Sequence, residues 1–517
     1  MKYFVLSLVI LISWFAEAES QVITKVVDIN PYGSSYPRFF FTFNNRLFFR
    51  ANDTIRVIDD ETLWSTDGTV KGTTKINDLK LLATIECNNN LYFYSYDDSG
   101  RFSLWKTSGS SGTTELVTYF HQRSNYTGGF GVLNNIMYFG AEDSVKGYEL
   151  WRSDGTDTGT VLFEDLNPNG SSAPFNFINL GDKLYFFSYD SLYNLILWST
   201  EGKPASTKQI LELIQTSSVS PRLTVLKNKL YFIYPDTSGD QNLWISDGTG
   251  PGTMILKQIS GPGSPAPTGF TRMGDSLYFV ARDGLGKSAL WLTDGTAAGT
   301  KDLVELNPST SLTPFQNKLY FSAPDKAGLT EPFVTDGTTS GTKNFVTINK
   351  RGDNANTHSF TPFKGKLYFI GSDGNSDDIY VTDGTSEGTR TLGPFDSPDF
   401  PTKPFAYFSG FFEFDGKLFF SANYDNKGVE LWTITDINER VRTPTDQSGE
   451  LRPSVVHSSL QLEVSAPTTI SIYDPLGKIV LIKRIVASEE INVSHLGSGI
   501  YFLRNEDNTF RAKFIKE

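Results

Sequence analysis

The side chains that most often carry enzyme chemistry are scarce in this sequence. It holds four histidines and a single cysteine, Cys87, so a histidine-based metal site or a triad with a histidine base has few candidates. The motifs Gly-x-Ser-x-Gly and His-Glu-x-x-His and the phosphate-binding loop are absent from the sequence. Cys87 comes just before an aromatic strand with no histidine near it in sequence, which favours a packed residue. Catalysis would therefore need carboxylates from distant segments.

Carboxylates do recur at regular positions. One aspartate series opens Asp-Gly-Thr turns. A second stands six residues after the first residue of each aromatic strand, at Asp53, Asp97, Asp143, Asp190, Asp236, Asp283, Asp325 and Asp373, with Asp425 one residue later in the last copy. Such an aspartate caps the turn on one interpretation, and binds calcium on the other. The calcium candidates are Asp373, Asn375 and Asp377, whose oxygens alternate along the chain.

The elements that must position these residues are copies of one unit. A Leu-Trp pair, or Pro-Phe or Ile-Tyr in its place, returns about every 46 residues, nine times in all. Each copy contains an aromatic or aliphatic segment, a Leu-Tyr-Phe strand, the Leu-Trp strand, an Asp-Gly-Thr turn and a further strand. Four short strands in such a length predict one blade of a β-propeller. The chain is therefore predicted to be all-β, with about nine four-stranded blades, or eight if one copy stands outside the ring.

The repeat also carries a resemblance. The segments YELWRSDGTDTGT (148–160) and ALWLTDGTAAGT (289–300) resemble the ELWxxDGT repeat family of secreted bacterial proteins, and the likeness extends over most of the predicted propeller domain, residues 19–437. The positions that carry the repeat are Trp64, Asp67, Trp151, Asp154, Trp244, Asp247, Trp291, Asp294, Asp336 and Asp383. Ser108 replaces the aspartate in one copy, and the ninth copy has no Asp-Gly-Thr turn. The resemblance implies a structural repeat and no particular activity.

The two ends of the array are complementary. Residues 24–31 resemble the fourth strand of a unit, as in 300–308, but no first three strands precede them. The ninth unit has its first three strands and lacks the fourth. We therefore expect the N-terminal strand to complete the last blade, beside the strand that holds Trp432.

A different module follows a polar linker, residues 438–453. Residues 454–517 lose the 46-residue period and alternate as short strands, which predicts a small antiparallel, Ig-like β-sandwich. The module resembles the type A sorting domain of the type IX secretion system, and the matching residues are Tyr473, Asp474, Gly477, Lys478, Leu496, Gly499, Tyr501 and Lys513. That resemblance implies passage across the outer membrane, with the type IX machinery and its surface peptidase as partners. An ordinary accessory sandwich is the alternative.

The N-terminus predicts export as well. Residues 1–18 have a basic start, a short apolar run and small residues before a cleavage site after Ala18, as in a secretory signal peptide. The mature chain contains no other stretch apolar enough to span a bilayer. We expect a secreted protein or one on the outer-membrane surface. The net charge of −12 argues against nucleic acid and favours a cation or a basic partner over an anionic polymer.

Loop lengths indicate where a ligand would bind. The second-to-third-strand loops and the crossovers between blades vary, and they share one face of the ring; His121, Arg123, Tyr126, His358 and Tyr407 are residues to inspect there. We expect a non-catalytic binding module for a glycan or a protein, with no cofactor unless calcium binds. The alternatives are a polysaccharide hydrolase or lyase on a propeller and a structural scaffold of the envelope or matrix.

Overall fold

The computed structural model describes residues 21–54, 61–96, 101–120, 128–214, 221–260, 268–282, 288–306, 308, 311–349, 351–374, 377–392, 410–425, 427–436, 454–456, 459–463, 468–474, 478–486, 488–505 and 511–516. The predicted signal peptide, with its cleavage after Ala18, and the predicted linker 438–453 lie outside these ranges. Within them the regular structure is β-strand throughout. None of these residues forms a helix long and apolar enough for a membrane crossing.

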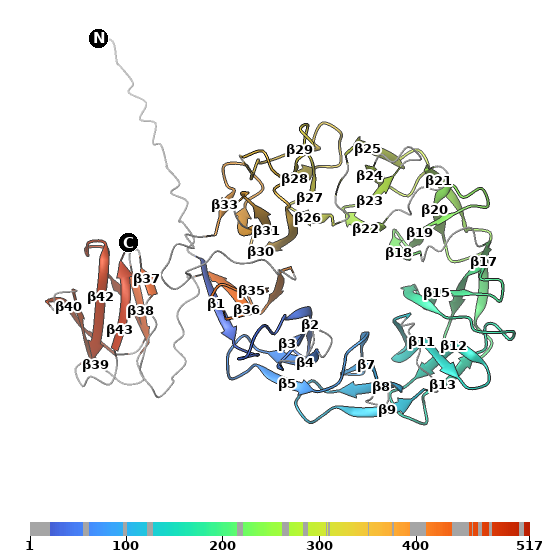
Figure 1. Cartoon of the computed structure of the whole chain (residues 1–517), viewed down its shortest axis with the longest axis horizontal. Helices are drawn as coiled ribbons and strands as arrows, with labels where there is room; N and C mark the ends of the chain where they lie inside the picture. The colour runs from blue at the N-terminus through green and yellow to red at the C-terminus, as the bar shows by residue number, and fades with distance from the viewer. Residues whose placement is uncertain are drawn as a thin grey trace, which may run out of the picture. The chain divides into compact units, whose positions relative to one another are not determined.

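The described part of the propeller forms nine four-stranded sheets, each a blade of a β-propeller (Figure 1). Blades 1 to 3 contain β2 (Arg38–Phe43), β3 (Arg46–Ala51), β4 (Thr62–Thr66) and β5 (Thr74–Asn77); β6 (Thr84–Cys87), β7 (Asn90–Tyr96), β8 (Phe102–Thr107) and β9 (Glu115–Tyr119); β10 (Phe130–Leu133), β11 (Ile136–Asp143), β12 (Gly147–Ser153) and β13 (Val161–Glu164). Blades 4 to 6 contain β14 (Phe175–Leu180), β15 (Lys183–Tyr189), β16 (Leu195–Thr200) and β17 (Lys208–Leu213); β18 (Thr224–Leu226), β19 (Lys229–Pro235), β20 (Gln241–Ser246) and β21 (Met254–Ser260); β22 (Thr268–Met273), β23 (Ser276–Arg282), β24 (Ser288–Thr293) and β25 (Lys301–Glu305).

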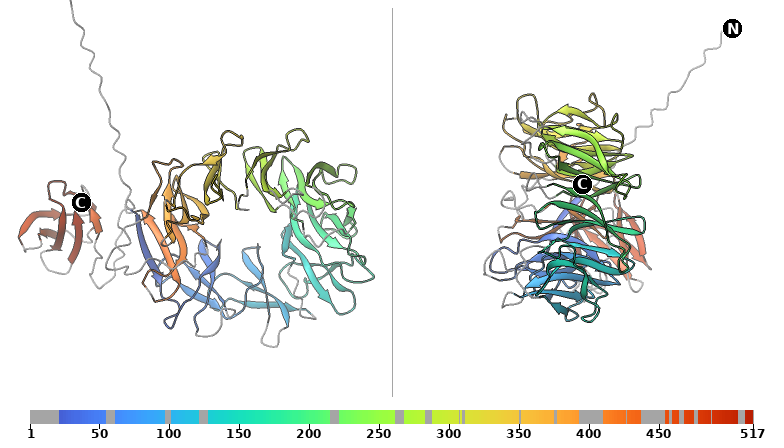
Figure 2. Two further views of the ribbon diagram at one scale, coloured as in Figure 1. Left: turned by 45° about the horizontal axis from the view of Figure 1, so that its top comes forward. Right: turned by 90° about the vertical axis from the view of Figure 1, so that its right-hand side faces the viewer.

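Blades 7 and 8 contain β26 (Thr313–Phe315), β27 (Lys318–Pro324), β28 (Thr330–Thr335) and β29 (Lys343–Asn344); β30 (His358–Phe363), β31 (Lys366–Ser372), β32 (Asp377–Thr382) and β33 (Arg390–Thr391). Blade 9 contains β34 (Phe412–Phe414), β35 (Lys417–Ala422) and β36 (Glu430–Asp436), with β1 (Gln21–Val27) as its fourth strand. The predicted propeller is therefore confirmed, and these residues show nine blades rather than eight. Figure 2 shows the blades following one another around the ring in chain order, and the labelled first strands β2, β18, β22, β26 and β30 lie toward the centre of the ring in Figure 1.

The Leu-Tyr-Phe strand of each blade is buried on both of its faces. In blade 4, Leu184 and Phe186 pack with the core of blade 3, whereas Tyr185 and Phe187 pack with the core of blade 5. A strand covered on both sides is apolar at successive positions rather than alternating. This burial explains why the second strand of every copy is an aromatic run.

The Asp-Gly-Thr turn closes on itself through side-chain hydrogen bonds. Asp247 Oδ1 accepts from the N–H of Thr249 at 2.9 Å and from its hydroxyl at 2.7 Å, and Thr249 Oγ1 accepts from the N–H of Gly252 at 3.1 Å. A Cβ on Gly252 would lie 2.0 Å from Asp247 Oδ1, so this position admits only glycine. Equivalent bonds form at Asp67, Asp154, Asp294, Asp336 and Asp383.

The same turn contacts the neighbouring blade. Gly248, at φ +90°, lies against the hydroxyl of Tyr185 in blade 4, and a Cβ there would stand 2.1 Å from that oxygen. Five further turn glycines meet the Leu-Tyr-Phe tyrosine, or its Met-Tyr-Phe equivalent in blade 3, of the preceding blade in the same way, at Gly155, Gly202, Gly295, Gly337 and Gly384. Two recurring sequence motifs are therefore the two halves of one contact between blades.

We predict that Gly248→Ala destabilises the propeller more than Gly181→Ala. Both glycines have positive φ, which costs an alanine about 1 kcal/mol, but a Cβ on Gly181 meets open space. Adding Tyr185→Phe to Gly248→Ala should recover part of the loss, because it removes the clashing hydroxyl. Urea-unfolding midpoints of the four variants measure this, and equal midpoints for the two alanine variants would contradict the contact.

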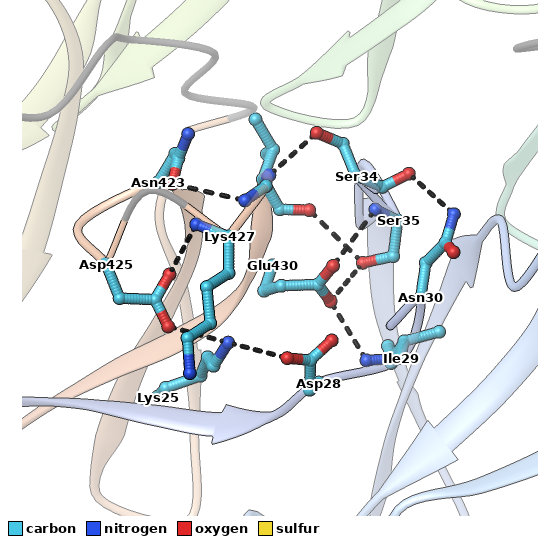
Figure 3. A network of polar contacts seen from close by, with 12 residues as sticks. Lys25, Asp28, Ile29, Asn30, Ser34, Ser35, Asn423, Asp425, Lys427 and Glu430 are labelled. Carbon is cyan, nitrogen blue, oxygen red and sulfur yellow. Dashed lines mark hydrogen bonds and ion pairs between the residues drawn. The ribbon is translucent and has the colours of Figure 1, made fainter. Parts of the chain in front are cut away.

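The ring is completed by the N-terminal segment, as the sequence predicts. β1 pairs with β36, the strand that holds Trp432, and becomes the outer strand of blade 9. Beyond β1, the buried carboxylate of Glu430 accepts hydrogen bonds from Ile29 N at 3.0 Å, Ser35 N at 3.2 Å and Ser35 Oγ at 2.6 Å (Figure 3). Lys25 adds ion pairs with Asp425 at 2.8 Å and Asp28 at 3.1 Å.

Deleting residues 19–31 from the mature chain should leave β36 as an open edge and remove the Ile29 donor from a buried carboxylate. We expect a loss of at least about 3 kcal/mol of unfolding free energy, because the last blade loses its outer strand and a buried carboxyl group loses a hydrogen-bond donor. Thermal and denaturant unfolding measure the loss. A peptide of residues 19–36 should restore stability, and a scrambled peptide should not; a truncated chain that melts like the parent would refute the closure.

The C-terminal residues form a separate two-sheet unit. One sheet runs β37 (Ser454–Val456), β43 (Arg511–Lys516), β42 (Gly499–Asn505), β39 (Thr468–Tyr473) and β40 (Ile479–Ile485), and the other pairs β38 (Ser459–Glu463) with β41 (Ser488–Asn492). Ile470, Ile472, Ile491, Val493 and Leu503 form its core. The prediction of a purely antiparallel sandwich is wrong at one place, because β37 pairs with β43 in parallel. A three-residue strand at the end of a polar linker is too short for its direction to show in a pattern.

Candidate functional site

The second aspartate series caps loops on the face where binding was expected. Asp143 Oδ1 accepts from the backbone N–H groups of Val145 at 2.7 Å and Lys146 at 2.8 Å. Asp190, Asp236 and Asp325 bind the backbone of their own loops in the same way. The capping interpretation is confirmed at these positions.

The calcium interpretation stays a prediction. Asp373 and Asp377 flank the second-to-third-strand loop of blade 8, but Asn375 lies outside the described residues. Among the residues that the structure describes, no group of three or more His, Cys, Asp or Glu side chains is placed to hold a metal ion.

Three buried glutamates were missed in the sequence. Glu149, Glu331 and Glu430 precede the Leu-Trp or Pro-Phe pair of their blades and are at most 1% exposed. Each carboxylate holds the crossover that follows its own blade: Glu149 accepts from Leu166 N at 2.7 Å and Ser172 N at 2.8 Å, and Glu331 accepts from Ile348 N at 2.9 Å. The sequence did contain a signal for these residues. In some copies a glutamate stands directly before the Leu-Trp pair, as in YELW and VELW, and a polar crossover follows the blade.

These glutamates have the electrostatics of an acid–base group and the surroundings of a structural one. Burial raises the pKa of Glu149 and of Glu430 to about 7, although their hydroxyl and backbone donors lower it. Perturbed carboxyl groups are often catalytic. Here, however, each carboxylate is engaged by backbone N–H groups from a crossover, and the three stand on blades 3, 7 and 9. They fasten the ring and form no convergent pair.

The raised pKa values predict how stability depends on pH. A carboxyl group with a folded pKa of about 7 and an ordinary unfolded pKa stabilises the fold fully below about pH 4, and this contribution is lost as pH rises through 7. We expect the urea midpoint of the mature chain to fall from pH 5 to pH 8 and Glu430→Gln to reduce that slope. A midpoint that stays constant or rises over this range would contradict the assignment.

Blade 1 departs from the repeat where its first and second strands pair. Where the first and second strands of other blades pair, the opposed residues are Phe175 and Phe187, Thr268 and Val280, or His358 and Ile370. In blade 1 they are Arg38 and Arg50. Like charges directly opposite each other destabilise an antiparallel pair. The stability of the blade therefore does not explain this choice of residues.

Phe39, next to Arg38, is strained and exposed. It occupies the bulge position of the first strand at φ +57°, where other blades have Asn176, Gly269 and Ser359, which suit positive φ better than a bulky aromatic residue does. Its side chain is 56% exposed, and the guanidinium carbons of Arg50 and Arg38 lie 4.2 and 5.4 Å from its ring centroid. Phe40 and Phe41 contact Phe49 and Phe48, so Phe39 is the aromatic of this run that is left exposed.

The charges of this cluster are only partly balanced. Buried Glu61 forms an ion pair with Arg38. Arg50 donates to the carbonyl oxygen of Leu82 in blade 2 at 3.0 Å, forms no ion pair with any residue that the structure describes, and has a buried Nε–H without an acceptor among them. Burial lowers the pKa of Arg50, Glu61 opposes this shift and Arg38 adds to it. An unsatisfied buried donor costs roughly 1–3 kcal/mol.

The structure thus places the candidate site at the blade 1 end where β2 begins and β3 ends, made of Arg38, Phe39, Arg50 and Glu61. It does not coincide with the residues chosen for inspection from the loops. His121, Arg123, Tyr126 and Tyr407 lie outside the described residues, and His358 is exposed with its Nδ1 2.9 Å from Ser359 Oγ. The signal for the site was an arginine in RLFFRA where other copies read as apolar, for example KLYFFS.

Apart from Lys513 and Gly477, the sorting-domain residues lie at or near the β39–β40 and β41–β42 connections. Asp474 Oδ1 accepts from Lys478 N at 2.9 Å, Tyr501 donates to Gly497 O at 2.9 Å, and Leu496 is buried. Tyr473 ends β39, Gly499 begins β42, and Lys513 lies on β43 opposite Phe502. Gly477 lies outside the described residues.

Comparison with known proteins identifies the C-terminal unit. Residues 453–517 match the family described as the secretion system C-terminal sorting domain. The predicted sorting domain is confirmed, and it implies export by type IX secretion to the cell surface or beyond. No curated protein matches the chain.

Among solved structures, the chain is similar to a puromycin hydrolase at 13% identity and a TM-score of 0.36, covering 84% of this chain and 63% of that one. It is also similar to a prolyl endopeptidase (9%, TM-score 0.40, 83% and 57%) and to a puromycin-hydrolysing peptidase of Mycobacterium tuberculosis (12%, TM-score 0.36, 67% and 60%). The chain spans less than two thirds of the length of each. The function has to be argued from its own residues.

Proposed function

We propose that this chain is an exported propeller that binds a glycan at the blade 1 cluster and does not turn it over. The observation that carries the proposal is the concentration at one place of opposed arginines, a strained exposed aromatic and a buried donor that has no acceptor among the described residues. Departures from local stability that gather in this way are typical of functional sites. An exposed ring beside guanidinium groups suits a sugar, which offers an apolar ring face and polar substituents.

Two alternatives are less well supported. A hydrolase or lyase needs convergent carboxylates, whereas Glu149, Glu331 and Glu430 are each engaged by a crossover and Glu61 by Arg38. A purely structural scaffold gives no reason for a blade that opposes two arginines. A protein ligand in place of a glycan is an outcome that the experiment below distinguishes.

Delivery follows from the C-terminal domain. We propose the type IX secretion machinery and its surface peptidase as partners of residues 454–517, in keeping with the sorting-domain match. The resemblance of the propeller repeats to the ELWxxDGT family agrees with an exported repeat protein.

Arg50→Val separates binding from folding. Valine restores the residue type found at Val280, so the variant should unfold at the same temperature as the parent or higher, and it leaves the Arg38–Glu61 ion pair in place. The mature chain and the variant are tested against immobilised dextran, xylan, polygalacturonate and chitosan, with and without calcium, for retention and for released oligosaccharides. We expect retention of at least one polysaccharide by the parent, its loss in Arg50→Val, and no release.

Three results would overturn the proposal. Reproducible release of oligosaccharides would show an enzyme. Unchanged retention in Arg50→Val would place the site elsewhere, and no retention of any polysaccharide would favour a protein ligand.

A further inference from the structure

Among the residues that the structure describes, the blade 1 cluster has one positive charge more than its neighbours balance. Arg38 and Arg50 contribute two cations, and Glu61 contributes one carboxylate, which is paired with Arg38. Arg50 makes a hydrogen bond to a carbonyl group and a contact with a ring, and no ion pair with the residues that the structure describes. Glu61 acts on Arg50 through its charge but forms its ion pair with Arg38, so a half-buried guanidinium is left that can gain a charge-assisted hydrogen bond from an anionic ligand.

Two contacts fix the position of the Arg50 guanidinium before a ligand binds. Leu82 O fixes one edge of the Arg50 guanidinium from blade 2 at 3.0 Å, and Phe39 lies 4.2 Å from its carbon. A planar guanidinium held in this way loses little freedom when it binds a carboxylate. The exposed ring of Phe39 stands beside it as an apolar surface.

Building on the proposed function, we infer that the ligand is a polysaccharide unit that carries a carboxylate, that is, a uronic acid residue. Its carboxylate would meet Arg50, and the apolar face of its ring would contact Phe39. A neutral sugar would leave the charge of Arg50 unmatched, and a small inorganic anion would make no use of Phe39. A basic partner would meet two guanidinium groups at this place.

The net charge of the chain opposes non-specific binding of an anionic polysaccharide. At −12, the protein as a whole repels a polyanion, and sequence-level electrostatics favoured a cation or a basic partner. Retention of a polyuronate therefore argues for a local group of cations rather than for general charge attraction.

The test compares polygalacturonate with its fully methyl-esterified form, which has the same backbone without the charge, and with dextran sulfate, which has charge without carboxylates. The mature chain should bind polygalacturonate at least about tenfold more tightly than either polymer. Arg50→Val and Phe39→Asn should each weaken that binding by about tenfold or more. Arg272→Ala, which changes an exposed arginine on the first strand of blade 6, should bind as the parent does.

The outcomes separate this inference from the proposed function. If polygalacturonate and its ester bind equally, and Arg50→Val loses the binding of both, recognition of a carboxylate is wrong but glycan binding at the blade 1 cluster still holds. Equal binding of dextran sulfate would overturn the preference for a uronic acid, and full affinity in Phe39→Asn would overturn the contact with the sugar ring. Binding that Arg50→Val leaves unchanged would overturn the inference and the proposed function together.

Discussion

A propeller ring closes only if its first and last elements meet, and in this chain they meet through β1 and β36. The carboxylate of Glu430 holds the segment that follows β1 by bonds to Ile29 and Ser35. Ser35 N also lies 2.9 Å from the carbonyl oxygen of Val429, and Ser421 donates to Pro37 O. The segment that leads into β2 is thereby fixed against blade 9, and the candidate site begins at its end, at Arg38 and Phe39. The geometry of the site thus depends on the closure of the ring.

The architecture could largely be predicted because short sequence patterns that recur in each blade determine it. Asp-Gly-Thr turns and aromatic second strands mark each blade, and the unmatched strands at the two ends of the array predicted the closure. What the patterns did not show is which residues meet across blades. Tyr185 and Gly248 recur for a common reason, but that reason is a contact between segments separated by a whole unit. The roles of Glu149, Glu331 and Glu430 were not predicted for the same reason, because their partners are backbone groups of crossovers that share no common sequence.

The candidate site was not predicted because it is a departure from the repeat. Arg50 looks like an ordinary surface arginine until the pairing places it opposite Arg38 and against blade 2. Phe39 is one of three consecutive phenylalanines, and the bulge decides which of them stays exposed. Eight other blades supply cores in which the same positions are mostly apolar. The stability of the ring as a whole therefore tolerates one blade that is poorly packed at a single corner.

The place of β36 has a mechanical consequence. The chain leaves the propeller from the end of this strand on its way to the C-terminal domain, so tension between the two would act first on β36. This strand is hydrogen-bonded on both sides, by β35 and by β1, instead of lying at a free edge. Removing β36 from its sheet therefore breaks two hydrogen-bonded ladders, whereas removing an outer fourth strand breaks one. By supplying the outer strand from the N-terminus, the chain places the strand that precedes the predicted linker in the interior of a sheet.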